Sequence, residues 1–180
     1  MKMIKSVLTG AMISALLSSG AMAANQGSGT ITFSGEIIDA PCSIHPDDTK
    51  QTIQMGSVSN ASLRNDNAAV KNFGIRLVGC DLQKYDLDGT PDGNNKWSGV
   101  KAKFTGTSLN NNKLLKISDN VGIELRHAGN PLTFGTASDK MELTGDQELS
   151  FQAQVKAVDK TGPISLGEFN SVANFELSYE

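Results

Sequence analysis

The sequence has few aromatic residues, few histidines and only two cysteines, and each scarcity removes classes of protein from consideration. Aromatic side chains make up 6% of the 180 residues, with a single tryptophan, Trp97, in a polar stretch. His45 and His127 are the only histidines, and neither has a nucleophile motif beside it. Two distant cysteines with so few histidines also make a poor metal site. We therefore expect no enzyme active site and no metal or other cofactor.

Positive charge and long apolar runs are also scarce. The chain has 16 lysines and arginines against 19 acidic residues, whereas nucleic-acid binders normally carry a basic stripe. The small cluster of Lys101 and Lys103 lies in an alternating pattern typical of the solvent-facing side of a strand. The longest apolar stretch, within residues 7–17, falls short of the roughly 20 residues that a membrane helix needs. These features exclude nucleic-acid binding and a membrane span.

Residues 1–23 have the features of an export signal. Lys2 and Lys5 precede an apolar middle, and residues 21–23 read Ala-Met-Ala, a small-x-small cleavage site. We expect cleavage after Ala23, which leaves 157 of the 180 residues, a length that suits one domain. The sequence therefore predicts a chain that is exported through an oxidising compartment.

Cys42 and Cys80 both remain after this cleavage. An oxidising compartment favours a single disulfide between them. The chain-entropy model gives about 4 kcal/mol for closing a loop of this length. We expect one disulfide that stabilises the fold.

Strand patterns follow one another along the chain, with alternation of apolar and polar residues. The apolar positions are Ile53 and Met55; Phe73, Ile75 and Leu77; Val100, Ala102 and Phe104; Val121, Ile123 and Leu125; Leu149, Phe151, Ala153, Val155 and Ala157; and Ala173, Phe175, Leu177 and Tyr179. Turn residues separate them, at Asp88-Gly89, Asp92-Gly93, Gly129-Asn130-Pro131, Gly145-Asp146 and Thr161-Gly162-Pro163. Only residues 61–70 could hold a short helical turn. The pattern predicts an all-β antiparallel sandwich of the immunoglobulin-like kind.

The acidic stretch of residues 86–94 resembles a calcium loop only faintly. In the register that places Gly89 sixth, the first position is Lys84 and the twelfth is Asn95. A calcium loop needs an aspartate at the first position and a bidentate glutamate at the twelfth. We therefore interpret the stretch as an acidic, turn-rich connection between strands.

The segment of residues 27–35 alternates like a strand but has no obvious partner. One face carries small or apolar residues, namely Gly27, Gly29, Ile31 and Phe33, and the other face is polar. Such a segment either begins the sheet of its own domain or lends a strand to another molecule. The sequence pattern alone leaves both alternatives open.

Several motifs in this order resemble the subunits of chaperone-usher fimbriae, and most of all a major shaft subunit. They are a leader, the glycine-containing arm, residues 35–44 around the first cysteine, Phe73-Gly74-Ile75-Arg76-Leu77 before the second cysteine, Gly167 and the penultimate Tyr179. Together they span essentially the whole mature chain. The resemblance implies a signal peptide at 1–23, an N-terminal donor-strand extension at 24–35 and a pilin domain at 36–180.

The resemblance implies an incomplete immunoglobulin-like sandwich, which a donor strand from another subunit completes. Its function would be that of a structural subunit that polymerises by donor-strand exchange into an adhesive surface fibre. The implied partners are neighbouring pilin subunits, a periplasmic chaperone, an outer-membrane usher and, for the fibre, a host-cell receptor. The alternative is a minor adaptor or tip subunit that contacts the receptor, although the length leaves no room for the added lectin domain of a tip adhesin.

The resemblance also assigns roles to residues. The donor strand would present Gly27, Gly29, Ile31 and Phe33, with Gly29 at a constricted pocket. Bordering the groove and contacting the chaperone would be Gly167, Phe175, Leu177, Tyr179 and Glu180. Because only Ile31 and Phe33 are bulky, the residue that initiates strand exchange is left open.

Overall fold

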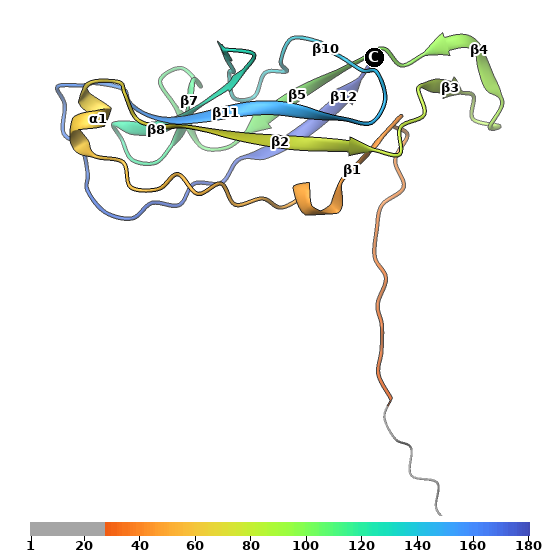
Figure 1. Ribbon diagram of the computed structural model, residues 1–180, viewed down its shortest axis with the longest axis horizontal. Helices are drawn as coiled ribbons and strands as arrows, with labels where there is room; N and C mark the ends of the chain where they lie inside the picture. The colour runs from red at the N-terminus through yellow and green to blue at the C-terminus, as the bar shows by residue number, and fades with distance from the viewer. Residues whose placement is uncertain (1–27) are drawn as a thin grey trace, which may run out of the picture. The chain divides into compact units, whose positions relative to one another are not determined.

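The computed structural model describes residues 28–180 (Figure 1). The chain divides into two units after Ile37, and we describe each by itself. Residues 28–37 have neither helix nor strand, and their side chains are exposed. The expected signal peptide and Gly27 lie outside the described residues. All the elements below belong to the second unit, residues 38–180.

Seven strands form the larger sheet, and all of its pairings are antiparallel. Its strands, in spatial order, are β1 (Ser43–Ile44), β2 (Val70–Val78), β11 (Gln147–Ala157), β8 (Val121–His127), β7 (Leu114–Lys116) and β6 (Ser108–Leu109), with β9 (Asn130–Pro131) paired to β8. The long strands β2 and β11 run side by side in Figure 1. The expected strands around Ile75, Ile123 and Phe151 are therefore confirmed.

A smaller sheet forms the second layer, and it lies behind β2 and β11 in Figure 1. It contains β10 (Met141–Glu142), β5 (Gly99–Thr105) and β12 (Asn174–Tyr179), in that order. β12 is an edge strand, because β5 is its single partner among the described residues. A separate hairpin joins β3 (Gln83–Tyr85) to β4 (Pro91–Lys96).

The core fills the space between the two sheets. Phe151, Ile75, Leu77 and Val100 are the largest side chains that are almost completely buried. Phe104 reaches from β5 to Phe151 on the opposite sheet, with ring centroids 5.1 Å apart in an edge-to-face arrangement, a geometry that aromatic pairs favour. The expected antiparallel immunoglobulin-like sandwich is confirmed, and its one-sided strands explain the alternation in the sequence.

Two short helical elements precede β2. They are the 3₁₀ helix η1 (Pro46–Asp48) and the helix α1 (Asn60–Arg64). Ser59 caps α1 by accepting a hydrogen bond from the Ser62 N–H at 3.0 Å, as serine commonly does at this position. The helical turn expected within 61–70 is therefore present, although it begins at Asn60.

The structure corrects three local expectations. Residues 51–59, expected as a strand around Ile53 and Met55, form no strand. Asp92-Gly93, expected as a turn, lies within β4, where Gly93 has a φ of +52°. In Gly129-Asn130-Pro131, also expected as a turn, the last two residues form the short strand β9. In each case, whether the residues formed a strand depended on a pairing partner that the local sequence does not reveal.

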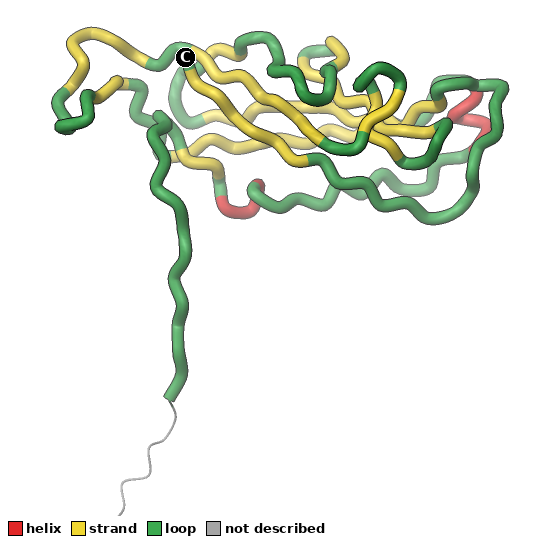
Figure 2. Tube along the Cα trace, turned by 180° about the vertical axis from the view of Figure 1, so that it is seen from behind, coloured by secondary structure: helices red, strands yellow, loops and turns green. Residues whose placement is uncertain are grey.

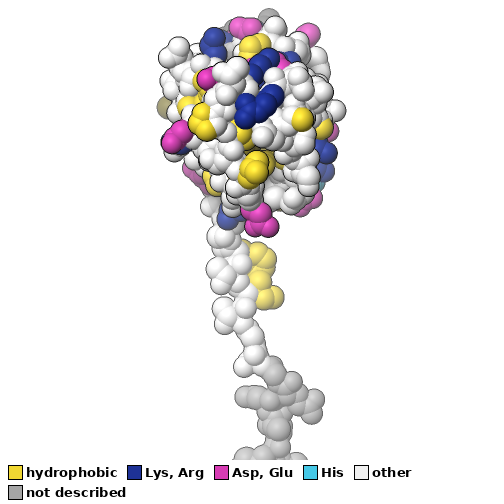
Figure 3. All heavy atoms as spheres, turned by 90° about the vertical axis from the view of Figure 1, so that its left-hand side faces the viewer, with side chains coloured by type: hydrophobic (Ala, Val, Ile, Leu, Met, Phe, Trp, Pro, Cys, Tyr) yellow, Lys and Arg dark blue, Asp and Glu magenta, His cyan; other side chains and the backbone are white. Residues whose placement is uncertain are grey.

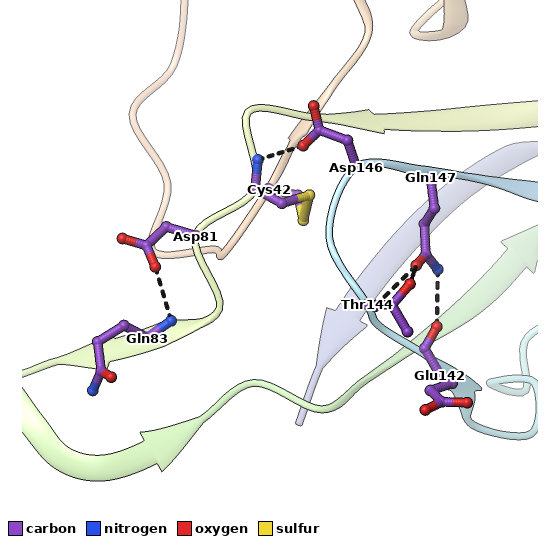
Figure 4. Close-up of a disulfide and its surroundings, with 8 residues drawn as sticks. Cys42, Asp81, Gln83, Glu142, Thr144, Asp146 and Gln147 are labelled. Atoms are coloured by element: carbon purple, nitrogen blue, oxygen red, sulfur yellow. Dashed lines mark hydrogen bonds between the residues drawn. A yellow bond between two sulfur atoms is a disulfide. The ribbon is translucent and has the colours of Figure 1, made fainter.

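The expected disulfide joins Cys42 to Cys80. It connects the chain before β1 to the chain after β2, and the side chain of Cys42 is buried. Asp146, in the turn before β11, accepts a hydrogen bond from the Cys80 N–H at 2.7 Å (Figure 4). The bridge therefore lies where three segments that are distant in sequence meet.

Candidate functional site

An apolar groove runs along the sandwich, lined by residues of both sheets. It encloses about 1770 Å³ between two long loop segments, residues 49–58 and residues 164–173, which Figure 2 shows in green along one side of the strands. Its floor consists of core side chains from both sheets, including Phe73, Ile75, Phe104, Leu115, Val121, Ile123, Leu125, Ala153 and Val155. The groove therefore opens directly onto the hydrophobic core.

One wall of the groove continues into the free edge of β12. Glu180 and Gly99 exchange both main-chain hydrogen bonds, each at 3.0 Å. Because hydrogen-bonded and non-hydrogen-bonded pairs alternate in an antiparallel ladder, the N–H and C=O groups of Phe175, Leu177 and Tyr179 point away from β5. These same three side chains face the core yet are only half-buried. β12 therefore offers main-chain groups and apolar side chains to a further strand.

The opposite wall, residues 49–58, has an alternating burial pattern without strand pairing. Met55 and Val58 are half-buried against the core, and Ile53 is half-buried in the groove lining, while their neighbours are exposed. Near its start, the Gln51 side chain donates a hydrogen bond to the Gly74 carbonyl at 2.7 Å. The sequence pattern thus predicted the direction of these side chains correctly, whereas the expected strand is missing because no neighbour provides a ladder.

Asp48 and Arg76 fix the beginning of this wall. The Asp48 carboxylate accepts hydrogen bonds from the Arg76 main-chain N–H, Nε and Nη2, all at 2.8 Å. These bonds lower the pKa of Asp48 to about 2, since they favour its charged form. Asp48 is 7% exposed, so a buried charge at this position needs its partner. The pair holds η1 against β2.

Residues 164–173 form the rim on the β12 side. Gly167 lies here with a φ of +134° and open space around it, a conformation that suits glycine. Leu166 and Val172 are 80% and 71% exposed although both line the groove. The sequence interpretation found Gly167 but missed these apolar residues. Their sequence signal was weak, because they occur as single large apolar side chains within a turn-rich stretch.

At the other end of β12, Tyr179 and Glu180 contact the hairpin region. Burial raises the pKa of Tyr179, whose ring packs against Trp97. Lys101 donates to the Glu180 carboxylate at 2.7 Å, and Lys140 lies 3.5 Å from it. The hydrogen bond from Lys101, together with the charge of both lysines, lowers the pKa of Glu180. Glu180 thus already has two cationic neighbours within its own chain.

The arm of residues 28–37 is extended (Figure 1), and its large apolar side chains are exposed. Ile31 is 79% exposed and Phe33 is 90% exposed, and apolar side chains of the arm stand out in yellow in Figure 3. A Cβ atom at Gly29 would meet nothing within 4 Å. Large apolar side chains exposed beside one another are typical of surfaces that another molecule covers. The expected role of Gly29, Ile31 and Phe33 in a donor strand stays a prediction, as does that of Gly27.

The described residues show no second site with a recognisable chemistry. Within residues 28–180 no group of His, Cys, Asp and Glu side chains is arranged to hold a metal ion. In the acidic loop, Asp88 accepts hydrogen bonds from the N–H and hydroxyl of Thr90, which is turn chemistry. His45 caps η1 by accepting a hydrogen bond from the Asp47 N–H. No helix in this part of the chain is long and apolar enough to cross a membrane.

Comparisons with known proteins agree with this geometry. The Fimbria A protein of Serratia marcescens is 36% identical over 172 residues, covering 91% of each chain. The Pap fimbrial major pilin protein of Escherichia coli is 34% identical over 190 residues, covering 99% of this chain and all of that protein. A solved structure of a chaperone-usher pilus, described as revealing the basis of rod uncoiling, matches with a TM-score of 0.73 and 31% identity, covering 86% of this chain and 97% of the other.

A family model described as fimbrial protein matches residues 31–180. The match includes Ile31 and Phe33 of the arm and the whole sandwich with its groove. Proteins similar to this chain are structural pilins and not enzymes. The chain belongs to the fimbrial protein family and is a structural subunit of a cell-surface fimbrium.

Proposed function

We propose that this subunit polymerises by donor-strand exchange, with the arm of one copy filling the groove beside β12 of another. The observation that carries the proposal is the free edge of β12. Its outward main-chain groups lie beside an apolar groove of about 1770 Å³, and the same chain carries an extended arm with exposed Ile31 and Phe33. A strand added to this edge gains main-chain hydrogen bonds and apolar burial together.

The arm is long enough to pair along the whole of β12. Ten extended residues cover about 33 Å, whereas the six residues of β12 need about 20 Å. Burial of Ile31 and Phe33 contributes roughly 1.5–3 kcal/mol for each side chain. The main-chain ladder supplies the rest, because the other inward positions, Gly27 and Gly29, have no side chain to bury.

The groove floor gives a reason for glycine in the arm. Phe104 lies 6.3 Å from Phe73 and 6.4 Å from Phe175, measured between ring centroids, so three aromatic rings occupy one part of the floor. A strand passing over these rings has little room for an inward side chain, and glycine permits close approach of its backbone. We assign this position to Gly29.

Before polymerisation the open core needs a temporary partner. We propose that a periplasmic chaperone fills the groove first and contacts Phe175, Leu177, Tyr179 and Glu180. At the outer-membrane usher, the arm of another subunit then replaces the chaperone. Gly167, with its left-handed φ, keeps the rim open. An uncovered edge and groove would otherwise lead to aggregation. Export through the periplasm after removal of residues 1–23 belongs to the same proposal.

Within the fibre we propose the role of the major shaft subunit. A relative that matches 99% of this chain is called a major pilin. A chain that carries both an arm and a groove can also add further copies of itself without limit. The adhesive function of the fibre toward a host receptor follows from this role. The minor adaptor is the competing assignment, and it predicts a few copies in each fibre where the shaft role predicts many.

Deletion of residues 24–34 tests the proposal. We expect the shortened subunit to fold and to bind the chaperone, since its groove is intact, but to be unable to serve as a donor to a growing fibre. Co-purification with the chaperone and the fibre yield after shearing of cells measure the two properties. A full-length protein that is a soluble and stable monomer without any chaperone would overturn the proposal.

A further inference from the structure

The two walls of the groove come together at the end that carries α1. The wall of residues 49–58 leads directly into Ser59 and α1, and the loop of residues 158–163 leads into the opposite wall. Arg64, the last residue of α1, donates hydrogen bonds from Nη1 to the carbonyl of Lys160 at 2.6 Å and to that of Gly162 at 3.2 Å. One guanidinium therefore joins the two walls.

Both sides of this connection are firmly anchored. On one side, Leu63 is buried in the core, which fixes α1 beside Arg64. On the other side, the Asn120 amide donates to the carbonyls of Asp159 and Pro163, at 2.8 and 3.0 Å. Asn120 also accepts from the Asp159 N–H at 2.8 Å. Arg64 thus binds a loop whose carbonyl groups are held in place.

The groove has no comparable connection at its other end. There Asp48 and Gln51 attach the wall of residues 49–58 to β2, while β12 is attached to β5. Within residues 38–180, no hydrogen bond or ion pair joins residues 45–58 to residues 164–180. Apart from Arg64, the link from the α1 end to the loop of residues 158–163 is the exposed pair of Lys160 and Asp66, 3.5 Å apart, while Lys156 of β11 also lies 3.7 Å from Asp66.

We propose that Arg64 is a positioning residue that holds the groove walls at the separation an incoming strand requires, an inference that rests on donor-strand exchange as the proposed function. Arg64 does not line the groove, so it acts through the loop carbonyls and not by touching the strand. Once a strand lies beside β12, its own ladder and packing connect the walls. Arg64 therefore matters for capturing the strand and much less for the completed sandwich.

The test compares Arg64→Met with Arg126→Met in the chaperone-bound subunit. Arg126 pairs with Glu124 on the larger sheet and does not line the groove, so its replacement is a matched control. The probe is a synthetic peptide of residues 24–35, and the measurement is the rate at which it displaces the chaperone. We expect capture to slow at least tenfold in Arg64→Met, which loses both hydrogen bonds of the guanidinium, and to be unchanged in Arg126→Met.

A second measurement separates positioning from general stability. The same substitutions are placed in a subunit whose arm sequence is fused after Glu180, so that the groove is filled within one chain. We expect Arg64→Met to unfold at nearly the same temperature as the unsubstituted fusion, and Arg64→Lys to recover part of the capture rate.

Three outcomes decide against the inference. Equal capture rates for Arg64→Met and the unsubstituted subunit would overturn it, and so would a fused Arg64→Met subunit that fails to fold. If the unsubstituted complex does not capture the peptide at all, the proposed function itself fails.

Discussion

The ring of Tyr179 packs edge-on against the indole of Trp97, with centroids 6.3 Å apart and planes inclined at 73°. The Lys84 ammonium also lies over the indole, 4.4 Å from its ring centre. Tyr179 is also the last residue of the free edge of β12. The chain's single tryptophan is therefore one side chain away from the free edge of β12.

Trp97 is expected to report on occupation of the groove. The chaperone and the arm place different side chains beside Tyr179, so the emission of Trp97 should change when a peptide of residues 24–35 replaces the chaperone. The same measurement on the Trp97→Phe subunit shows how much of the fluorescence comes from the chaperone. An unchanged emission of Trp97, with peptide binding demonstrated by mass, would show that the strand does not reach Tyr179.

Phe33→Asp is expected to prevent stable polymerisation while leaving the subunit's own sandwich intact. The substitution removes roughly 1.5–3 kcal/mol of apolar burial and adds a charge that would be buried in the neighbour's groove. Fibre yield after shearing of cells should fall at least tenfold, and the amount of chaperone-bound subunit should stay the same. Thr32→Asp, on the opposite face of the arm, is the control and should polymerise normally; equal yields from the two variants would contradict an inward Phe33.

Cys42→Ser is expected to damage the fold itself. The disulfide closes a loop with a sequence separation of 38 residues, for which the chain-entropy model gives about 4 kcal/mol. Both the chaperone-bound subunit and the fibre should therefore decrease, unlike the result for Phe33→Asp. Cys80→Ser serves as the matched variant and should behave identically. Normal levels of the chaperone complex in either variant would argue that the bridge is dispensable.

The Asp48–Arg76 pair should make the stability of the sandwich depend on pH in the acid range. The pKa of Asp48 is about 2 in the folded subunit against an ordinary value of 3.8, so its stabilising contribution is fully present above about pH 4 and is lost as the pH falls toward 2. Asp48→Asn should remove this part of the dependence and lower stability at neutral pH, because Arg76 loses its charged partner.

Thermal unfolding of the arm-fused subunit between pH 2 and pH 7 measures this effect. Asp47→Asn is the control, since Asp47 lies 3.7 Å from Arg76 and is largely exposed, and exposed pairs of this kind contribute little. Identical pH profiles for Asp48→Asn and the unsubstituted fusion would contradict the assigned role of the pair.

Much of the sandwich could be predicted because its strands are buried on one face. Ile75 and Leu77 point into the core while Arg76 between them points outward, and period-two alternation records this arrangement in the sequence. The alternation of Ile53 and Met55 reflects the same one-sided burial, but it could not reveal that their segment lacks a strand partner. Hydrogen-bond pairing depends on a neighbour, whereas side-chain direction depends on the residue's own position.

The apolar rim was not predictable from local sequence. Leu166 and Val172 occur singly within a turn-rich stretch, where isolated apolar residues are ordinary. Their location beside the groove results from the path of residues 158–173, which Asn120 and Arg64 fix through main-chain carbonyl groups. Because such bonds use carbonyls that every residue possesses, the sequence contains no signal for the acceptor side.

The sequence by itself determined the strand-rich class, the pairing of Cys42 with Cys80 and the resemblance to fimbrial subunits, since alternation, cysteine number and motif order are local or countable properties. Only the tertiary structure decided that β12 is an edge strand, that the groove opens onto the core and that Arg64 joins its walls. These features depend on which segments become neighbours, and the free energy of that choice comes from burial and pairing summed over the whole sandwich.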